Sequence, residues 1–295
     1  MENFFNKHVL DDFKLRLPTG ELLHDTAILP NFTRDFLKID IDEVWAKMLK
    51  YGDHPIDKPI EKGGEVRWVT GDNPALKYRG NAIKRHKIWA QTNLDSGLSR
   101  YGYTGWQYRV APATVKVEDL PIKSMVDKIN EKLELGKAHN NWILTQYRSG
   151  SDNIGFHSDK MKDFEKDSCF IVIKCGESRK FEFSWDEPSV EEAKKALKKA
   201  EKEKVKDAIK EAKTKLKLAI KNRKYPEVFY SKTLDAGTAI IVGTQANSRV
   251  KHGVPSIERK DHLSGSIVGR SIKTMMQWED INRKINGCRK RKFNE

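Results

Sequence analysis

The sequence has 295 residues, 38% of them hydrophobic and 33% charged, which is enough apolar material for a packed core. No apolar run approaches the roughly 18 residues that span a bilayer, the N-terminus lacks a leader pattern, and the three cysteines form no metal or disulfide motif. We therefore expect a soluble intracellular protein of the nucleus or cytoplasm, without membrane partners. The formal net charge of +14 favours nucleic acid as a partner, with a merely lysine-rich surface as the alternative.

The first half of the chain mixes helical and strand-like patterns. Residues 36–52 have the apolar spacing of an amphipathic helix, and so do residues 120–136, which end at Gly136. Between them, residues 65–110 change to short alternating runs interrupted by glycine and asparagine, a pattern typical of β-hairpins and loops. We expect residues 1–64 to form an N-terminal extension that packs on the core.

The second half is rich in strand-like segments that follow one another without the strand–helix alternation of a parallel sheet. These segments are residues 142–148, 168–176, 180–185, 233–243 and 264–278. Many short strands separated by turns indicate a sandwich or barrel. The expected fold is α+β, with a double-stranded β-helix (jelly-roll) core and flanking N-terminal helices.

One charged segment, residues 189–224, interrupts these strands. It consists almost wholly of Ala, Lys, Glu, Leu and Ile, contains no glycine or proline, and repeats apolar residues at helical spacing. It predicts an inserted long helix or helical hairpin, which is either a solvated spacer or a lysine-rich arm for phosphates or a partner. Residues 281–295 form a basic tail, either a disordered end or a targeting or phosphate-contacting segment.

The strongest candidate for chemistry is a metal site. His157 and Asp159 are two residues apart, so on a strand their side chains point the same way, and His252 follows 95 residues after His157. Two imidazoles and one carboxylate leave three positions open on a metal, which suits non-haem iron(II) with a bidentate co-substrate and O₂. Structural histidines are the alternative, but each histidine follows a strand and a polar turn, and Arg270 comes on the next strand.

Several segments resemble the AlkB family of nucleic-acid dioxygenases. LTQYRSGSDNIGFHSD resembles the family's iron-binding segment, and LDAGTAIIVGTQANSRVKHGVP resembles its strand, loop and distal histidine. IVGRSIKTM resembles the strand that carries the arginine for 2-oxoglutarate, and RHKIWAQ with SRYGYTGWQY resembles the nucleotide-recognition region. The resemblance covers about residues 65–280, with nucleotide recognition at about residues 75–112.

The resemblance implies an iron(II)- and 2-oxoglutarate-dependent dioxygenase. His157, Asp159 and His252 would be its catalytic iron ligands. Arg270 would pair with the distal carboxylate of 2-oxoglutarate, since a planar guanidinium suits a carboxylate, and Tyr147 would donate a second hydrogen bond to it.

Three positions depart from the family pattern. Thr145, a candidate co-substrate contact, stands where the family usually has asparagine. Met161, a candidate substrate contact, replaces a common acidic residue, and Met276 replaces a common second arginine. The last two lie where the family tunes substrate choice, so the chemistry is better defined than the substrate.

The substrate side is predicted from aromatic residues interleaved with basic ones over residues 77–109, a surface that stacks bases and follows a phosphate backbone. The aromatic candidates are Trp89, Tyr101, Tyr103, Trp106 and Tyr108, and the basic candidates are Lys77, Arg79, Lys84, Arg85 and Lys87. Core packing is the alternative for each aromatic side chain.

The expected reaction hydroxylates a C–H bond while 2-oxoglutarate and O₂ are converted to succinate and CO₂. On an N-methylated base of DNA or RNA the product would lose formaldehyde, which is oxidative demethylation, as in DNA repair. On a carbon-bound methyl the hydroxyl group would remain. The alternatives are the same oxygenase chemistry on a protein or small molecule, and a non-catalytic nucleic-acid-binding protein; the sequence does not indicate an oligomeric state.

Overall fold

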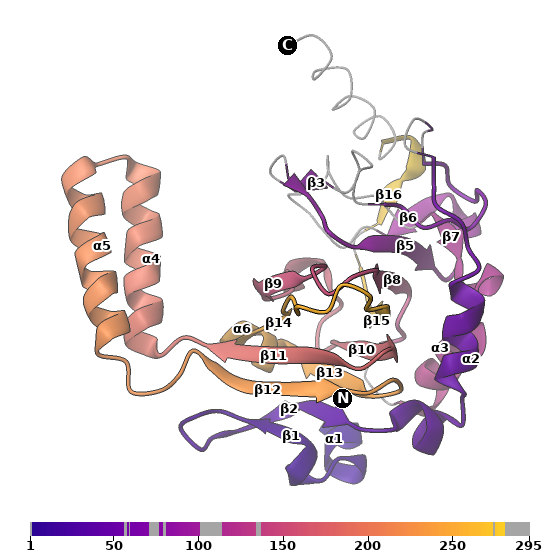
Figure 1. Cartoon of the computed structure of the whole chain (residues 1–295), viewed down its shortest axis with the longest axis horizontal. Helices are drawn as coiled ribbons and strands as arrows, with labels where there is room; N and C mark the ends of the chain where they lie inside the picture. Colours follow the sequence, from indigo (N-terminus) through magenta and orange to yellow (C-terminus); the bar gives the residue numbers. More distant parts are fainter. Residues whose placement is uncertain are drawn as a thin grey trace.

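The structure, a computed structural model, describes residues 2–55, 58, 60–70, 77–78, 81–100, 114–133, 137–273 and 275–280, and two sheets form its centre (Figure 1). The larger sheet has the strand order β1 (Lys14–Arg16), β2 (Leu22–Leu29), β13 (Ala239–Gly243), β10 (Cys169–Gly176), β15 (Ser264–Arg270), β8 (Asn141–Tyr147), β5 (His86–Gln91), β7 (Val115–Lys116). The smaller sheet has the order β12 (Val228–Leu234), β11 (Arg179–Trp185), β14 (Val250–Val254), β9 (Ile154–His157). Neighbouring strands are antiparallel except β5 and β7, which are parallel.

From β8 to β15 the chain passes repeatedly between the two sheets. Strands β8, β10, β13 and β15 lie in the larger sheet, and β9, β11, β12 and β14 lie in the smaller one. Two two-stranded sheets lie outside both of these: β3 (Lys77–Tyr78) pairs with β4 (Asn81–Ala82), and β6 (Leu98–Arg100) pairs with β16 (Met275–Gln277). The α+β class with a large antiparallel sheet is as predicted, and the alternation is consistent with the expected jelly roll.

Helices cover the outer face of the larger sheet. These are α1 (Glu2–His8), α2 (Ile41–Met48) and α3 (Lys123–Lys132), while α6 (Thr244–Arg249) joins β13 to β14. Helix α2 begins after Asp40, whose carboxylate accepts hydrogen bonds from the backbone N–H groups of Asp42 (2.9 Å) and Glu43 (3.2 Å). Single turns of 3₁₀ helix lie at Asp11–Phe13, Leu94–Ser96, Val117–Asp119 and Met161–Asp163, and a π turn lies at Thr33–Leu37.

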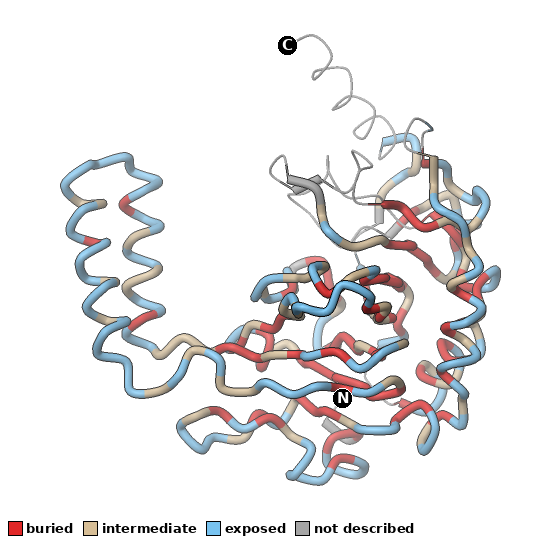
Figure 2. Tube along the Cα trace, viewed as in Figure 1, coloured by how far each residue is buried: buried red, intermediate tan, exposed pale blue. Residues whose placement is uncertain are grey.

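The strands of the larger sheet alternate between two cores, because successive side chains point to opposite faces. On β10, Ile171 and Ile173 face the helices and share a core with Trp45, whereas Phe170 faces the interior with Phe183 of β11. Figure 2 shows the buried residues concentrated along the two sheets. The interior core is therefore the space that the two sheets enclose.

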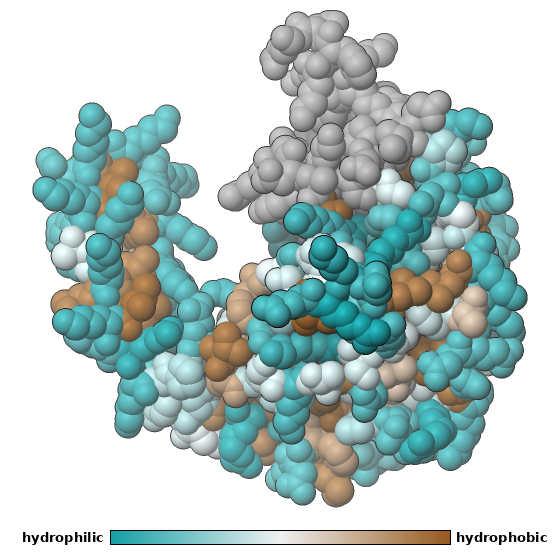
Figure 3. Space-filling view, in the orientation of Figure 1, coloured by the Kyte–Doolittle hydropathy of each residue, from teal (hydrophilic) through white to brown (hydrophobic). Residues whose placement is uncertain are grey.

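The predicted insertion is a helical hairpin, α4 (Pro188–Glu203) and α5 (Lys206–Lys221), between β11 and β12. Lys204 has a left-handed backbone (φ 59°), which turns the chain between the two helices. Figure 3 shows the hairpin standing away from the rest of the molecule, with an open hollow between them. No helix within the described ranges is long and apolar enough to cross a membrane.

The structure refines three sequence predictions. The N-terminal extension adds β1 and β2 to the edge of the larger sheet, in addition to its helices. Residues 233–243 contain the end of β12 and the whole of β13, separated by a turn in which Gly237 has φ +82°. Residues 264–278 divide into β15 and β16, and the predicted tail, residues 281–295, lies outside the described residues.

Glycines of β15 allow tryptophan rings to approach the outer face of the larger sheet. A Cβ atom at Gly265 would lie 2.3 Å from Cη2 of Trp45, closer than real contacts allow. Gly265→Ala is therefore expected to lower the free energy of unfolding by about 1–3 kcal/mol, as overpacked core positions do. Urea denaturation would measure this, with Gly64→Ala as control, since its nearest contact would be an ordinary 3.5 Å. Equal stability of the two variants would contradict the packing argument.

Candidate metal centre

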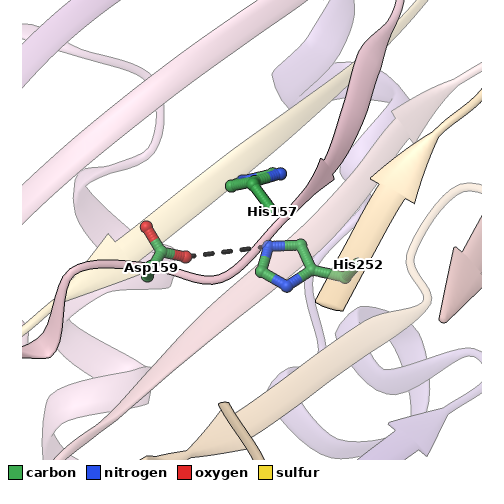
Figure 4. Close-up of side chains that lie close together, drawn as sticks. All are labelled: His157, Asp159 and His252. Carbon is green, nitrogen blue, oxygen red and sulfur yellow. Dashed lines mark ion pairs between the residues drawn. The ribbon is translucent and has the colours of Figure 1, made fainter. Parts of the chain in front are cut away.

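His157, Asp159 and His252 come together beside the smaller sheet (Figure 4). His157 is the last residue of β9 and lies directly opposite His252 of β14 in the strand pairing, with ring centroids 4.3 Å apart. Asp159 follows β9 by two residues. One nitrogen or oxygen atom from each side chain lies within 4.8 Å of the others, so the three could hold one metal ion.

The protonation states suit a metal. Burial, with the neighbouring His157, lowers the pKa of His252 to about 3, and burial also lowers the pKa of His157. Burial alone would raise the pKa of Asp159, but the charge of Arg270 and the two histidines hold it below its usual value. At neutral pH the site therefore offers two neutral imidazoles and one carboxylate, the forms that bind metals.

Hydrogen bonds orient two of the three ligands, whereas Nδ1 of His252 is buried without a partner among the described residues. Nδ1 of His157 donates to the backbone carbonyl of Gly155 (2.9 Å), which leaves Nε2 for a metal. Oδ1 of Asp159 accepts from Nη2 of Arg270 (2.7 Å), while Oδ2 lies 3.7 Å from Nε2 of His252. The side-chain amide of Asn247 bonds to both the backbone N–H and the carbonyl of Asp159, each at 2.9 Å. His157 and Asp159 are therefore held in place by hydrogen bonds, and His252 is held by its place in β14 opposite His157.

A cavity of about 570 Å³ extends from these ligands into the space between the sheets. Its wall on the larger sheet consists of residues directly opposite one another on β10, β15 and β8. The rows, in order from the metal ligands, are Phe170 with Arg270, then Val172, Val268 and Ile143, then Lys174, Ser266 and Thr145, then Ser264 with Tyr147. Polarity along the cavity thus runs from charged, through apolar, to polar and cationic.

The far end of the cavity carries two buried cations. Burial lowers the pKa of Lys174 to about 8, and its ammonium donates to the backbone carbonyls of Cys175, Gly176 (3.4 Å) and Glu177 (2.6 Å). The guanidinium of Arg179 lies 5.5 Å from the ring centroid of Tyr147. Arg179 Nε and Ser264 Oγ are buried without a hydrogen-bond partner among the described residues. This end offers positive charge and unused donors, which is the environment that a carboxylate needs.

The predicted co-substrate residues all line this cavity. Tyr147 and Thr145 do so from β8, and both are buried. Arg270 lies beside the candidate metal ligand Asp159, so the structure brings its guanidinium to the metal end of the cavity. Met161 is partly buried against the interior core and is not among the lining residues.

The predicted substrate residues are divided. Arg85 and Lys87 of the segment around β5 line the cavity. Trp89 does not: it is 2% exposed and packs in a small core with Val69 and Ile143, so its ring is not available to stack on a base. Lys84 is exposed and is not among the lining residues, and Lys77 lies in β3. The other candidates, Arg79, Tyr101, Tyr103, Trp106 and Tyr108, lie outside the described residues.

Three of the cavity residues that the sequence interpretation overlooked have side chains suited to binding. Lys174 stands at an inward position of the apolar strand CFIVIKCG, and a charged residue at such a position is a signal that could have been used. Arg179 begins the next strand and carries no comparable signal. Phe156, next to His157, is 38% exposed at the cavity and is an aromatic surface that a flat substrate could contact.

No protein-family model matches the sequence, and no curated protein matches it. Among solved structures, the chain is similar to OsALKBH1, with 14% identity over 84% of this chain and 96% of that chain and a TM-score of 0.42. It is also similar to a prolyl hydroxylase from Trichoplax adhaerens in complex with a hypoxia inducible factor oxygen degradation domain peptide fragment, with 9% identity over 95% and 89% of the two chains and a TM-score of 0.37. Both likenesses are distant, so the chemistry rests on the site itself.

Proposed function

We propose that this chain is an iron(II)- and 2-oxoglutarate-dependent dioxygenase that oxidises a nucleic-acid base, by oxidative demethylation of an N-alkylated base in DNA or RNA. The observation that carries the proposal is the triad His157, Asp159 and His252 at one end of a cavity whose other end is cationic. A facial set of two imidazoles and one carboxylate suits iron(II) that must also bind a co-substrate and O₂.

The three side chains would hold the iron, which supplies the redox chemistry that couples oxidative decarboxylation of 2-oxoglutarate to hydroxylation of the substrate. Because Arg270 engages Oδ1 of Asp159, the free oxygen of that carboxylate is the one that faces His252. Arg270 therefore orients a metal ligand. Its role as partner of the co-substrate, which the resemblance implies, stays a prediction.

The cavity wall matches the chemistry of 2-oxoglutarate along its length. The keto-acid end of the molecule belongs at the metal ligands, and its two methylene groups belong beside the apolar row of Val172 and Val268. Rows two residues apart on a strand are separated by about 6.6–6.8 Å. The distal carboxylate would then reach the polar end, where we place it with Lys174 and with the hydroxyl group of Tyr147.

Among the described residues, three side chains at the cavity could contact a base. Arg85 and Lys87 line the cavity, and Lys87 is buried, with a pKa that burial lowers well below its ordinary value. Phe156 offers an exposed ring next to a metal ligand. An aromatic face beside a cation such as Arg85 is the combination that holds an unstacked base and its phosphate.

One experiment tests the proposal. The protein is incubated with iron(II), labelled 2-oxoglutarate and a panel of N-methylated DNA and RNA oligonucleotides, and both succinate and the mass of each oligonucleotide are measured. We expect succinate formation that a methylated oligonucleotide stimulates, with loss of one methyl group per succinate. Succinate formation without any change in the oligonucleotides would indicate that the substrate is a protein or small molecule. No succinate with any oligonucleotide would refute the proposed dioxygenase activity.

Lys174 gives a prediction on pH. Its pKa of about 8 means that the ammonium loses its charge as the pH rises through 8, so the free protein should bind the dicarboxylate less well above that pH. We expect kcat/KM for 2-oxoglutarate to fall above pH 8, since this ratio reports the free enzyme. Lys174→Gln should lower it by about 10–100-fold at pH 7, as expected for a lost charged hydrogen bond, and should remove the decline above pH 8.

Two controls separate this role from general effects of charge. Lys180→Gln removes an exposed lysine from the rim of the same cavity and should leave the pH profile unchanged. Lys174→Arg keeps a charge at every pH tested and should extend the activity into the alkaline range. A Lys174→Gln profile that still declines above pH 8 would show that another group titrates.

A further inference from the structure

The α4–α5 hairpin holds most of the net charge of the chain. Residues 188–224 contain fourteen lysines and arginines against six acidic residues, a net charge of +8 out of +14 for the whole sequence. The hairpin leaves the smaller sheet close to the candidate metal centre, because Phe183 of β11 lies directly opposite His252 and α4 begins at Pro188. A strongly charged element therefore stands beside the site.

The base of the hairpin is fixed to the strand of the distal metal ligand. Asp186, which is nearly buried, forms ion pairs of 2.6 Å with Lys194 of α4 and with Lys251, the neighbour of His252. The Glu187 carboxylate accepts hydrogen bonds from two backbone N–H groups where α5 returns, each at 2.6 Å. These contacts hold the arm at a defined angle to the rest of the molecule (Figures 1 and 3).

One face of α5 carries an unbroken row of lysines, at steps of four, three, four and four residues. Such steps place side chains above one another on a helix, and the row is about 22 Å long at 1.5 Å per residue. Its members are Lys206, Lys210, Lys213, Lys217 and Lys221, all of them exposed. None forms an ion pair with any residue that the structure describes, whereas Lys215 on the opposite side of α5 pairs with Glu211 at 2.6 Å.

An uncompensated row of this kind fits a phosphate backbone better than a folded protein surface. Duplex DNA presents about one negative charge per 1.7 Å of axis, so the length of the row faces a dozen or so charges. Three exposed apolar side chains of the hairpin, Val205, Leu218 and Ile220, are the features that would favour a protein partner. Val205 lies at the turn between the two helices, whereas the five cations extend over the whole of α5.

We propose that the α4–α5 hairpin is an arm that binds the sugar-phosphate backbone of a nucleic acid and holds it beside the cavity, through the row from Lys206 to Lys221. This inference rests on the proposed function for the identity of the substrate, but the binding itself requires no turnover. The row would position the polymer without reading its sequence, because contacts to phosphates carry no base information.

The test compares two triple variants of the full chain that each remove three positive charges from the hairpin. The row variant is Lys210→Gln, Lys213→Gln and Lys217→Gln; the control is Lys195→Gln, Lys199→Gln and Lys215→Gln, which changes lysines already paired with glutamates. Glutamine and lysine have similar helix propensities, and circular dichroism would check the folds. Binding of fluorescent, unmethylated duplex and single-stranded oligonucleotides is measured by anisotropy at several salt concentrations, without 2-oxoglutarate.

The row variant should bind at least about 10-fold more weakly near 0.1 M salt, and its log Kd–log salt slope should fall by about 2–3, one for each lost phosphate contact. The control should change affinity by less than about threefold, because charges away from the contact act only through a screened field. Equal losses of affinity in both variants, or no loss in the row variant, would overturn the proposal that the hairpin binds nucleic acid through this row. Because binding is measured without the co-substrate, it does not depend on turnover. If the hairpin binds nucleic acid but the enzyme is inactive, binding succeeds and the succinate assay fails; if the enzyme is active but the hairpin does not bind, the reverse is observed.

Discussion

Replacing His157 by alanine is expected to abolish metal binding and succinate formation together. The side chain supplies one of three ligand atoms that lie within 4.8 Å of one another, and two ligands cannot form the facial set. The loss in kcat/KM should exceed about 100-fold, because even outer contacts to a metal ligand are worth 10–100-fold. The measurements are the metal content of the protein after loading and succinate release.

A stability measurement gives this prediction a readout besides activity. A metal ion at 100 times its Kd stabilises a folded protein by about 2.7 kcal/mol, so iron(II), or manganese(II) in its place, should raise the Tm of the unchanged chain. His24→Ala, which changes an exposed histidine of β2, should keep this increase. His157→Ala should lose it without a lower Tm in chelator. A metal-dependent increase that survives in His157→Ala would place the metal elsewhere.

The spacing of His157 and Asp159 predicted that these two ligands lie on the same side, whereas including His252 depended on the resemblance as well. His157 and Asp159 are close in sequence, and a strand with one following turn can only bring them to the same side. His252 is distant, and it was found because a strand precedes it; the register that places it opposite His157 is a property of the whole sheet. Strand order, unlike strand periodicity, has no local signal in the sequence.

Arg270 shows that the alternation of a strand predicts which way a side chain points but not where along the cavity it lies. Its inward orientation follows from the alternation of β15, and the structure has it lining the cavity as that alternation requires. Its position along the cavity depends on how β15 and β10 are paired, which sets Arg270 against Phe170 and Ser266 against Lys174. The sequence alone could not tell which of the inward residues of β15 would reach the metal end.

Trp89 illustrates the opposite limit. An aromatic residue among lysines and arginines is compatible with a binding surface and with a core, because β-strands of an edge region alternate between the two. The tertiary structure distinguishes the two, because Val69 and Ile143 pack against the Trp89 ring and make it a core residue. Arg85 and Lys87, from the same segment, line the cavity instead, and their role toward a substrate stays a prediction.

Replacing Asp159 by alanine is expected to destabilise the metal-free protein by about 3–5 kcal/mol, because it leaves the guanidinium of Arg270 buried without its anion. Both side chains are almost inaccessible, with exposures of 4% and 6%, and their atoms lie 2.7 Å apart. Since the pKa of Asp159 is below its ordinary value, the stabilising effect is complete at neutral pH and is lost as the pH falls through that lowered pKa.

The double variant Asp159→Ala with Arg270→Met makes the argument quantitative. An apolar side chain of similar length needs no counterion, so the double variant should be more stable than Asp159→Ala alone, with a coupling energy of about 0.5–3 kcal/mol from urea denaturation in chelator. Losses that simply add would mean that the two residues do not act as a pair. Arg270→Met alone also separates two roles. An orienting residue should lower metal affinity with little change in the Kd of 2-oxoglutarate for the metal-loaded protein, whereas a partner of the distal carboxylate should raise that Kd as Lys174→Gln does.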